Sequence, residues 1–403
     1  MPGFPNTVER RVAYYHRVKI LERRLLSFSL FNFFVVTVSG LLLRGIPLGI
    51  NVPLTYGNIL HGHSHFAFGG WVTPGLIWLI MKAFPELTHR VAYAHWRNML
   101  IMLLLSAYGM LISFPLQGYA AVSITFSTLS IAATFYFAVM LLRASRGIHE
   151  ISINFLRAGL LFLMLSSLGP FALGAIVASG NAASPVYFNS IYFYLHFQYN
   201  GWFTFAILAV AYRKFILQTN AGRAAFILLF TGCILSLLLS FTWNQPGLVV
   251  NIIGGGGAAM QLAGVLYLIY DLSKNRTTIN ITWLEKIALS AFGLKILLQL
   301  SSAFPVVAAV AYLHRNYIIA YLHLVMLGFV TTFILGSIIQ TLAPGVSKAL
   351  KPALILFLSS FILSELLLVF HDFPLPVFIV SCGFPVAALV IYRIYMVAPE
   401  LRK

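Results

Sequence analysis

The chain carries very little charge for its length. Only 9% of its 403 residues are Asp, Glu, Lys or Arg, whereas 60% are hydrophobic and the mean hydropathy is +0.91. A water-soluble core cannot absorb so much apolar sequence, and the apolar residues form runs of about 20, the length that spans a bilayer. These runs do not alternate with polar residues, which excludes a membrane β-barrel. We therefore predict an all-α, polytopic membrane protein whose partner is the lipid bilayer.

Cysteine is also scarce. The two cysteines, Cys233 and Cys382, both fall in apolar runs, where we expect them to be packing residues. The sequence has no CxxC motif and no disulfide framework, and it has no CxxCH motif, which excludes covalent c-type haem. A cleavable signal peptide is not expected, because the stretch before the first apolar run is too charged.

Acidic residues are few as well. The sequence has 26 basic residues and only 9 acidic ones, so its net charge is +17. The basic residues gather in alternate short loops between the apolar runs, while the opposite loops hold only Arg44 and Arg315. Membrane topology therefore explains the charge, and nucleic-acid binding is not expected. The positive-inside rule places both termini in the cytoplasm. We expect the membrane to be a bacterial-type inner membrane.

We predict twelve transmembrane helices, near residues 25–43, 59–81, 98–117, 120–142, 154–178, 187–212, 224–243, 251–272, 282–303, 316–341, 351–370 and 374–396. Residues 1–24 form a basic amphipathic segment that we expect to lie on the cytoplasmic surface. Residues 25–397 then make one transmembrane domain, followed by a cytoplasmic tail at 398–403. No repeat with a period of 20–50 residues stands out.

Histidines inside the predicted spans are the strongest functional signal. His61, His63 and His65 begin the second span; on a helix, His61 and His65 project from one side and His63 from the opposite side. His196 in the sixth span and His323 in the tenth lie at a similar depth, roughly 5–15 Å below the outer boundary. Intramembrane histidines mark functional sites. Three spans at one depth favour a shared site over three separate structural hydrogen bonds.

Other residues near this layer are unusual for a membrane helix. Gly254–Gly257 weakens the eighth span, which fits either close helix packing or the approach of a bulky group. Lys295 lies mid-span in the ninth helix and Glu365 deep in the eleventh. Each is a candidate for a proton path, a haem propionate contact or a quinone contact, and a structural ion pair between them is the alternative.

Twelve spans with histidines on the second, sixth and tenth resemble the catalytic subunit I of haem-copper oxygen reductases and bacterial nitric oxide reductases. The C-family, or cbb-type, oxidases are the most similar. His61–Gly70 resembles their second span, and Tyr321–Phe329 resembles their tenth. The resemblance implies a low-spin b-type haem with two axial histidines, His323 and either His61 or His65. Arg315, at the outer entrance, is then a propionate contact.

The same resemblance implies an incomplete copper and high-spin haem centre. His196 matches the sixth-span copper ligand, whereas Tyr321 stands where the family has the histidine of its high-spin haem. The family's pair of copper histidines would lie near Gln245–Pro246, where this chain has none. Tyr321 could itself ligate haem iron, as tyrosine does in catalase. The candidate metal ligands are therefore His61, His63, His65, His196 and His323.

The resulting prediction is a haem protein of respiratory electron transfer, an oxidoreductase if it turns over. It would work with other respiratory-complex subunits or an electron donor. One alternative is a member of the twelve-span haem-copper family of the nitric oxide stress response, without turnover, which His61-Gly62-His63 resembles. Another is a transporter whose histidines carry a transition-metal ion or protons, although no inverted repeat or pair of broken helices is seen.

Overall fold

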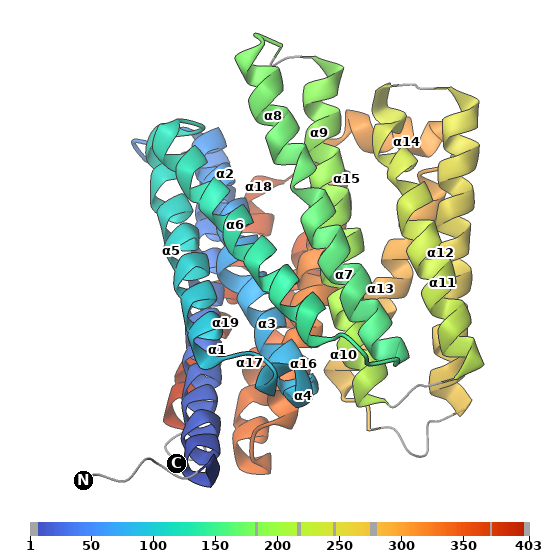
Figure 1. Ribbon diagram of the computed structural model, residues 1–403. Coiled ribbons are helices and arrows are strands. Elements are labelled where there is room, and N and C mark those ends of the chain that lie inside the picture. The colour runs from blue at the N-terminus through green and yellow to red at the C-terminus, as the bar shows by residue number, and fades with distance from the viewer. Residues whose placement is uncertain are drawn as a thin grey trace. The chain divides into compact units, whose positions relative to one another are not determined.

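The computed structural model describes residues 7–181, 184–215, 219–244, 247–274, 280–370 and 373–398. All regular structure in these residues is helical (Figure 1). The chain divides into two compact units. Unit 1 comprises Met1–Ala144, Thr341–Ser364 and Pro374–Lys403, and unit 2 comprises Ser145–Gln340 and Glu365–Phe373.

Unit 1 is built from long apolar helices. In chain order they are α1 (Thr7–Gly45), the short 3-10 turn η1 (Ile46–Leu48), α2 (Tyr56–Phe66), the π-helical segment η2 (Ala67–Val72), α3 (Thr73–Ala83), α4 (Pro85–His89), α5 (Tyr93–Gln117), α6 (Ala121–Ala144), most of α17 (Pro344–Phe370), α18 (Pro374–Ser381) and α19 (Gly383–Val397). α5 runs beside α6, and α1 packs against α19 and against α2–η2–α3 (Figure 1). The second predicted span is therefore one helix with a π-helical middle.

Unit 2 is built mostly from shorter helices. They are α7 (Ile151–Ser166), α8 (Leu168–Ala178), α9 (Pro185–Leu195), the π-helical η3 (His196–Phe203), α10 (Thr204–Lys214), α11 (Asn220–Ser236), the 3-10 segment η4 (Leu237–Asn244), α12 (Leu248–Lys274), α13 (Trp283–Ser301), α14 (Pro305–Leu313), α15 (Arg315–His323), the π-helical η5 (Leu324–Thr331) and α16 (Thr332–Gln340). The last turn of α17 also belongs to this unit.

The glycine run of α12 serves helix packing. α11 and α12 lie side by side (Figure 1), and a Cβ atom on Gly257 would come within 2.6 Å of the Ser236 backbone nitrogen. A Cβ on Gly254 would meet Leu239 at 2.9 Å. Of the two readings that the sequence allowed for this run, the structure supports close helix packing at these two positions.

Ten helices among the described residues are long and apolar enough to cross a membrane, or eleven if α13 and α14, bent by 108°, are counted as one span. The sixth predicted span is helical from Pro185 to Lys214 but is not among the ten. His196, Gln198 and Asn200 lower its hydropathy. The chain is thus a polytopic helical membrane protein, and the number twelve stays a prediction.

The N-terminal segment and the first predicted span form one helix, and the surface position of residues 1–24 stays a prediction. The sequence separates a surface helix before residue 24 from a span that begins at 25, but α1 continues without a break from Thr7 to Gly45. No proline occurs in this stretch, and its first glycine is Gly40, so nothing in the backbone ends the helix earlier. Residues 1–6 and 399–403 lie outside the described residues.

A buried carboxylate joins three helices of unit 2. Glu285, on the first turn of α13, is fully buried and closes a capping box with Thr282. The same carboxylate accepts hydrogen bonds from Lys214 on α10 and from Gln340 on α16, the latter at 3.0 Å. A buried charge is tolerated only when it is paired and hydrogen-bonded in this way. This ion pair fixes one end of the three helices.

Replacing Glu285 by Ala should destabilise the protein by about 3 kcal/mol, because Lys214 is left without its buried partner. Glu150→Ala is the matched control. The Arg213–Glu150 pair is about one-third exposed, with side-chain exposures of 31% and 35%, so its loss should cost at most about 1 kcal/mol. Denaturant unfolding in detergent measures both values, and equal losses would contradict the assigned role of Glu285.

Candidate functional site

Each of the three histidine-bearing spans contains a π-helical segment at or just after its histidine. η2 begins two residues after His65, η3 begins at His196, and η5 begins directly after His323. π-Helical turns are rare, and they occur frequently at functional sites. The π-helical segments therefore coincide with the intramembrane histidines His65, His196 and His323.

These three places also share a sequence motif. His65–Thr73, His196–Thr204 and His323–Thr331 each have a glycine five residues after the histidine, Trp or Phe after six, and Thr after eight. In all three copies the glycine, the aromatic residue and the threonine are buried. The copies stand roughly 130 residues apart, far beyond the periods of solenoid repeats. The motif makes His65, and not His61, the positional equivalent of His196 and His323.

Side-chain hydroxyl and amide groups satisfy the backbone at these π-helical turns. The Thr204 hydroxyl donates to the Tyr199 carbonyl at 2.7 Å, and the Thr332 hydroxyl donates to the Leu327 carbonyl at 2.8 Å. In unit 1 the Asn32 amide donates to the Gly70 carbonyl at 2.7 Å. Lipid offers no hydrogen-bond partners, so a carbonyl displaced from the helical pattern needs such a donor. Of these three donors only Thr204 is the threonine of the shared motif, since the third copy has Thr331 at that position and Asn32 lies on another helix.

The three histidines of the second span point to two sides of α2. His65 stacks on Phe114, with ring centroids 4.5 Å apart, and its Nε2 lies 3.2 Å from the Tyr119 hydroxyl. His61 contacts the same two aromatic rings. His63 faces α1, where its Nδ1 lies 2.9 Å from the Ser39 hydroxyl. The prediction that His61 and His65 share a side and His63 faces away is confirmed.

His196 is buried in a network that engages both of its ring nitrogens. Its Nε2 lies 2.8 Å from the Cys233 carbonyl, and its Nδ1 lies 3.0 Å from the Asn200 amide nitrogen. These partners assign a neutral ring that donates from Nε2 and accepts at Nδ1. A copper ion could bind only by displacing one of them. The residues around His196 therefore do not fit the copper ligand implied by the resemblance.

His323 has a different environment, in which a carboxylate holds one ring nitrogen. Its Nδ1 lies 3.0 Å from Glu365 Oε1, and the Glu365 side chain is only 11% exposed. The carboxylate accepts a hydrogen bond from Nδ1–H and so fixes the tautomer whose lone pair is on Nε2. Histidines that ligate metals donate their other N–H to a carboxylate in this manner. His323 thus fits an iron ligand.

The suggested ion pair between Lys295 and Glu365 is not present. Glu365 pairs with His323 instead, and Lys295 Nζ has no hydrogen-bond partner among the described residues. The two residues lie on different helices, α13 and α17. Glu365 is therefore the partner of His323, and Lys295 pairs with neither residue.

The remaining candidates are Tyr321, Arg315 and the region of Gln245 and Pro246. Tyr321 makes an edge contact with Tyr199, with ring centroids 6.4 Å apart, and Arg315 is exposed at the start of α15. Gln245 and Pro246 lie outside the described residues. Within the described ranges, no group of three or more His, Cys, Asp or Glu side chains gathers as a metal-binding cluster.

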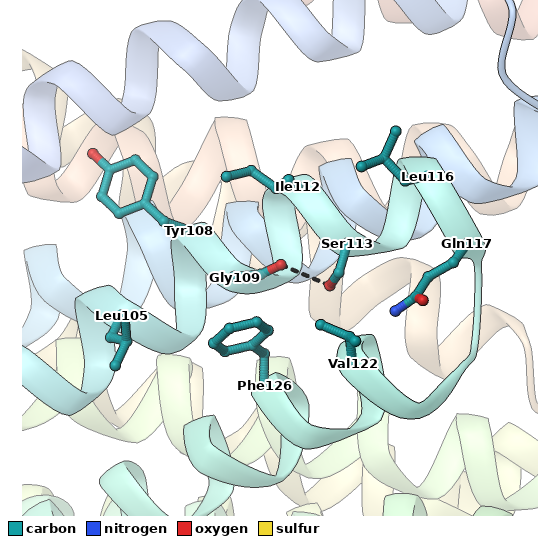
Figure 2. Close-up of a pocket in the computed structure, with 9 residues that line it drawn as sticks. All are labelled: Leu105, Tyr108, Gly109, Ile112, Ser113, Leu116, Gln117, Val122 and Phe126. Carbon is teal, nitrogen blue, oxygen red and sulfur yellow. Dashed lines mark hydrogen bonds between the residues drawn. The ribbon is translucent and has the colours of Figure 1, made fainter.

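A groove of about 450 Å³ lies between α5 and α6 in unit 1 (Figure 2). Its walls are almost entirely apolar, and Phe126 packs directly over Gly109, where any Cβ atom would collide with the ring. Ser113 donates to the Gly109 carbonyl at 2.6 Å, so its hydroxyl is satisfied within α5. The groove contains none of the candidate histidines, and its surface suits contact with lipid chains.

Replacing Thr204 by Val should destabilise the protein by about 1–3 kcal/mol, because the Tyr199 carbonyl loses this side-chain donor. Thr125→Val is the control: its hydroxyl also bonds a carbonyl one turn back, that of Ala121, but on the exposed face of regular helix α6. That change should stay within about 0.5 kcal/mol. Thermal unfolding in detergent compares the two variants, and the proposed role of Thr204 fails if they match.

No family model matches this chain, and none of the curated proteins matches its sequence. The haem-copper resemblance therefore rests on the residues of the second, sixth and tenth predicted spans.

Proposed function

We propose that this chain is a membrane haem protein similar to subunit I of haem-copper oxidases, in which a low-spin b-type haem transfers electrons. The observation that carries the proposal is the Nδ1 hydrogen bond from His323 to the buried Glu365 carboxylate. This bond orients the imidazole and makes Nε2 a stronger donor. His323 and Glu365 both belong to unit 2, so this unit alone provides the first proposed axial ligand and its partner.

The resemblance assigns the second axial position to a histidine of the second span, His61 or His65. His65 occupies the same motif position as His323, and binding iron through its Nε2 would displace the Tyr119 hydroxyl. Two imidazole donors leave no open coordination position, so the bound haem would supply reversible one-electron transfer rather than a place for substrate. Electron transfer, with a partner subunit or another donor, is accordingly the proposed activity.

Unit 2 also provides an apolar environment next to His323. Phe329 is completely buried and stacks on Phe292, with ring centroids 4.9 Å apart. Val325 and Val330, on the same π-helical segment, are completely buried as well. A low-dielectric, water-excluding surrounding tunes the reduction potential of a metal group. The engaged nitrogens of His196 do not favour a copper centre, so reduction of oxygen or nitric oxide is not part of the proposal.

His323→Ala should lower the haem content of the purified protein by about tenfold or more, because a first ligand is worth at least as much as the second-shell partners that support it. His95, outside the proposed site and bonded to Tyr136, is the control position, and His95→Ala should keep the wild-type spectrum. Reduced-minus-oxidised absorbance of the purified protein measures both. Absence of a haem spectrum in the wild type, or an unchanged spectrum in His323→Ala, would refute the proposal.

Glu365→Gln should raise the reduction potential of the haem, because the negative charge beside the ligand stabilises the ferric state. A shift of about 60 mV corresponds to a tenfold change in a one-electron equilibrium and is the expected order of magnitude. Ser359→Ala, at an exposed position on the same helix, should leave the potential unchanged. Redox titration followed by absorbance gives the value, and an unchanged or lower potential in Glu365→Gln argues against this role.

A further inference from the structure

The groove between α5 and α6 is formed by one face of each helix in unit 1 (Figure 2). Leu105, Gly109, Ser113 and Gln117 follow one another at intervals of four along α5, so they share one face of that helix. Gly109 and Ser113 are small, and they hollow out the middle of this face. Phe126 of α6 lies opposite them. Two small residues between longer ones therefore produce the groove.

The polar side-chain oxygens that line the groove are already hydrogen-bonded within the protein. The Tyr108 hydroxyl donates to Asn32 Oδ1 on α1 at 2.5 Å, and the Ser113 hydroxyl is satisfied within α5. The Gln117 amide oxygen accepts from two backbone N–H groups at the start of α6, at 3.3 and 2.9 Å. A polar ligand would find no unpaired side-chain oxygen here. The groove therefore suits a ligand made of hydrocarbon.

The groove opens on the surface of the helix bundle. Ile112 and Leu116 line it and are 61% and 69% exposed. On a polytopic membrane protein, apolar side chains exposed along a span contact lipid. Water does not fill an apolar hollow, and an empty hollow loses the dispersion contacts of its walls. An apolar component of the membrane therefore has to fill the groove.

The length of the groove matches half of a bilayer. From Leu105 to Gln117, α5 rises about 18 Å, and the hydrocarbon layer of one leaflet is about 15 Å thick. Leu105 lies at the middle of α5, and α5 ends at Gln117. A transmembrane helix of a partner is about 10 Å wide and crosses both leaflets, so it does not fit a narrow groove of half that length. A single lipid chain does.

We propose that the groove between α5 and α6 binds one acyl chain of a membrane phospholipid. The methyl end of the chain lies beside Leu105, and its ester end lies beside Gln117, where both helices reach the membrane boundary. The groove holds the chain by close van der Waals packing, the force that also drives helix association in membranes. The site lies entirely in unit 1, contains no candidate histidine and needs no haem. It is therefore independent of the proposed electron-transfer function.

Photochemical labelling tests this inference. The purified full chain in detergent micelles is mixed with a phospholipid that carries a diazirine at the methyl end of one acyl chain, and mass spectrometry of peptides locates the label. Labelling of the groove should saturate as the lipid concentration rises. Ser113→Leu fills the groove and should lower this labelling about tenfold, as the loss of roughly ten atom–atom contacts predicts. Thr125→Leu, at an exposed position of α6 outside the groove, is the matched control and should keep it.

Unchanged groove labelling in Ser113→Leu, or wild-type labelling spread evenly over all exposed helices, would overturn the proposal. Leu116→Ala lowers an exposed wall of the groove, so it should also reduce the labelling and carries the test if Ser113→Leu does not fold. An isoprenoid quinone at equal concentration should not compete; displacement of the phospholipid by the quinone would overturn the assignment to an acyl chain. His323→Ala should keep the labelling, which separates this inference from the proposed haem site.

Discussion

The structure depends on one constraint, which is that every backbone polar group in an apolar surrounding needs a partner within the protein. The helices meet it along most of their length, but the three π-helical segments displace carbonyls from the regular pattern. Thr204, Thr332 and Asn32 supply the missing donors. Polar side chains therefore gather where the helices depart from α-geometry. The histidines lie at these same places, so the local backbone and the candidate chemistry are linked.

One motif produces two chemically different histidines in unit 2. Both ring nitrogens of His196 form hydrogen bonds within the protein, and the bond to the Cys233 carbonyl connects η3 to α11. His323 uses Nδ1 on a carboxylate, which is the arrangement that prepares Nε2 for a metal. The difference comes from the residues that pack against each ring, a backbone carbonyl and an amide for His196 and Glu365 for His323. The motif sets the position of the imidazole in the helix. The residues that pack against the ring then determine whether a ring nitrogen is available to bind a metal.

The sequence predicted the features that depend on local pattern. Long apolar runs gave the helical membrane architecture, and helix periodicity placed His61 and His65 opposite His63. The sequence did not predict contacts between residues distant in the chain. The pairing of His323 with Glu365 and the isolation of Lys295 both depend on how separate helices pack. The three-copy motif is a weak sequence signal, because its copies share only four positions and lie roughly 130 residues apart.

The central claim is that His323 binds haem iron through Nε2 while Glu365 holds Nδ1. Electron paramagnetic resonance of the oxidised protein with ¹⁵N-labelled histidine tests it directly, because pulsed spectra resolve nitrogen nuclei bound to a ferric iron. Our account predicts a low-spin signal coupled to two imidazole nitrogens in the wild type, and one of these couplings should be missing from the small amount of haem that His323→Ala retains. A high-spin signal, or two imidazole couplings that persist in His323→Ala, would contradict it.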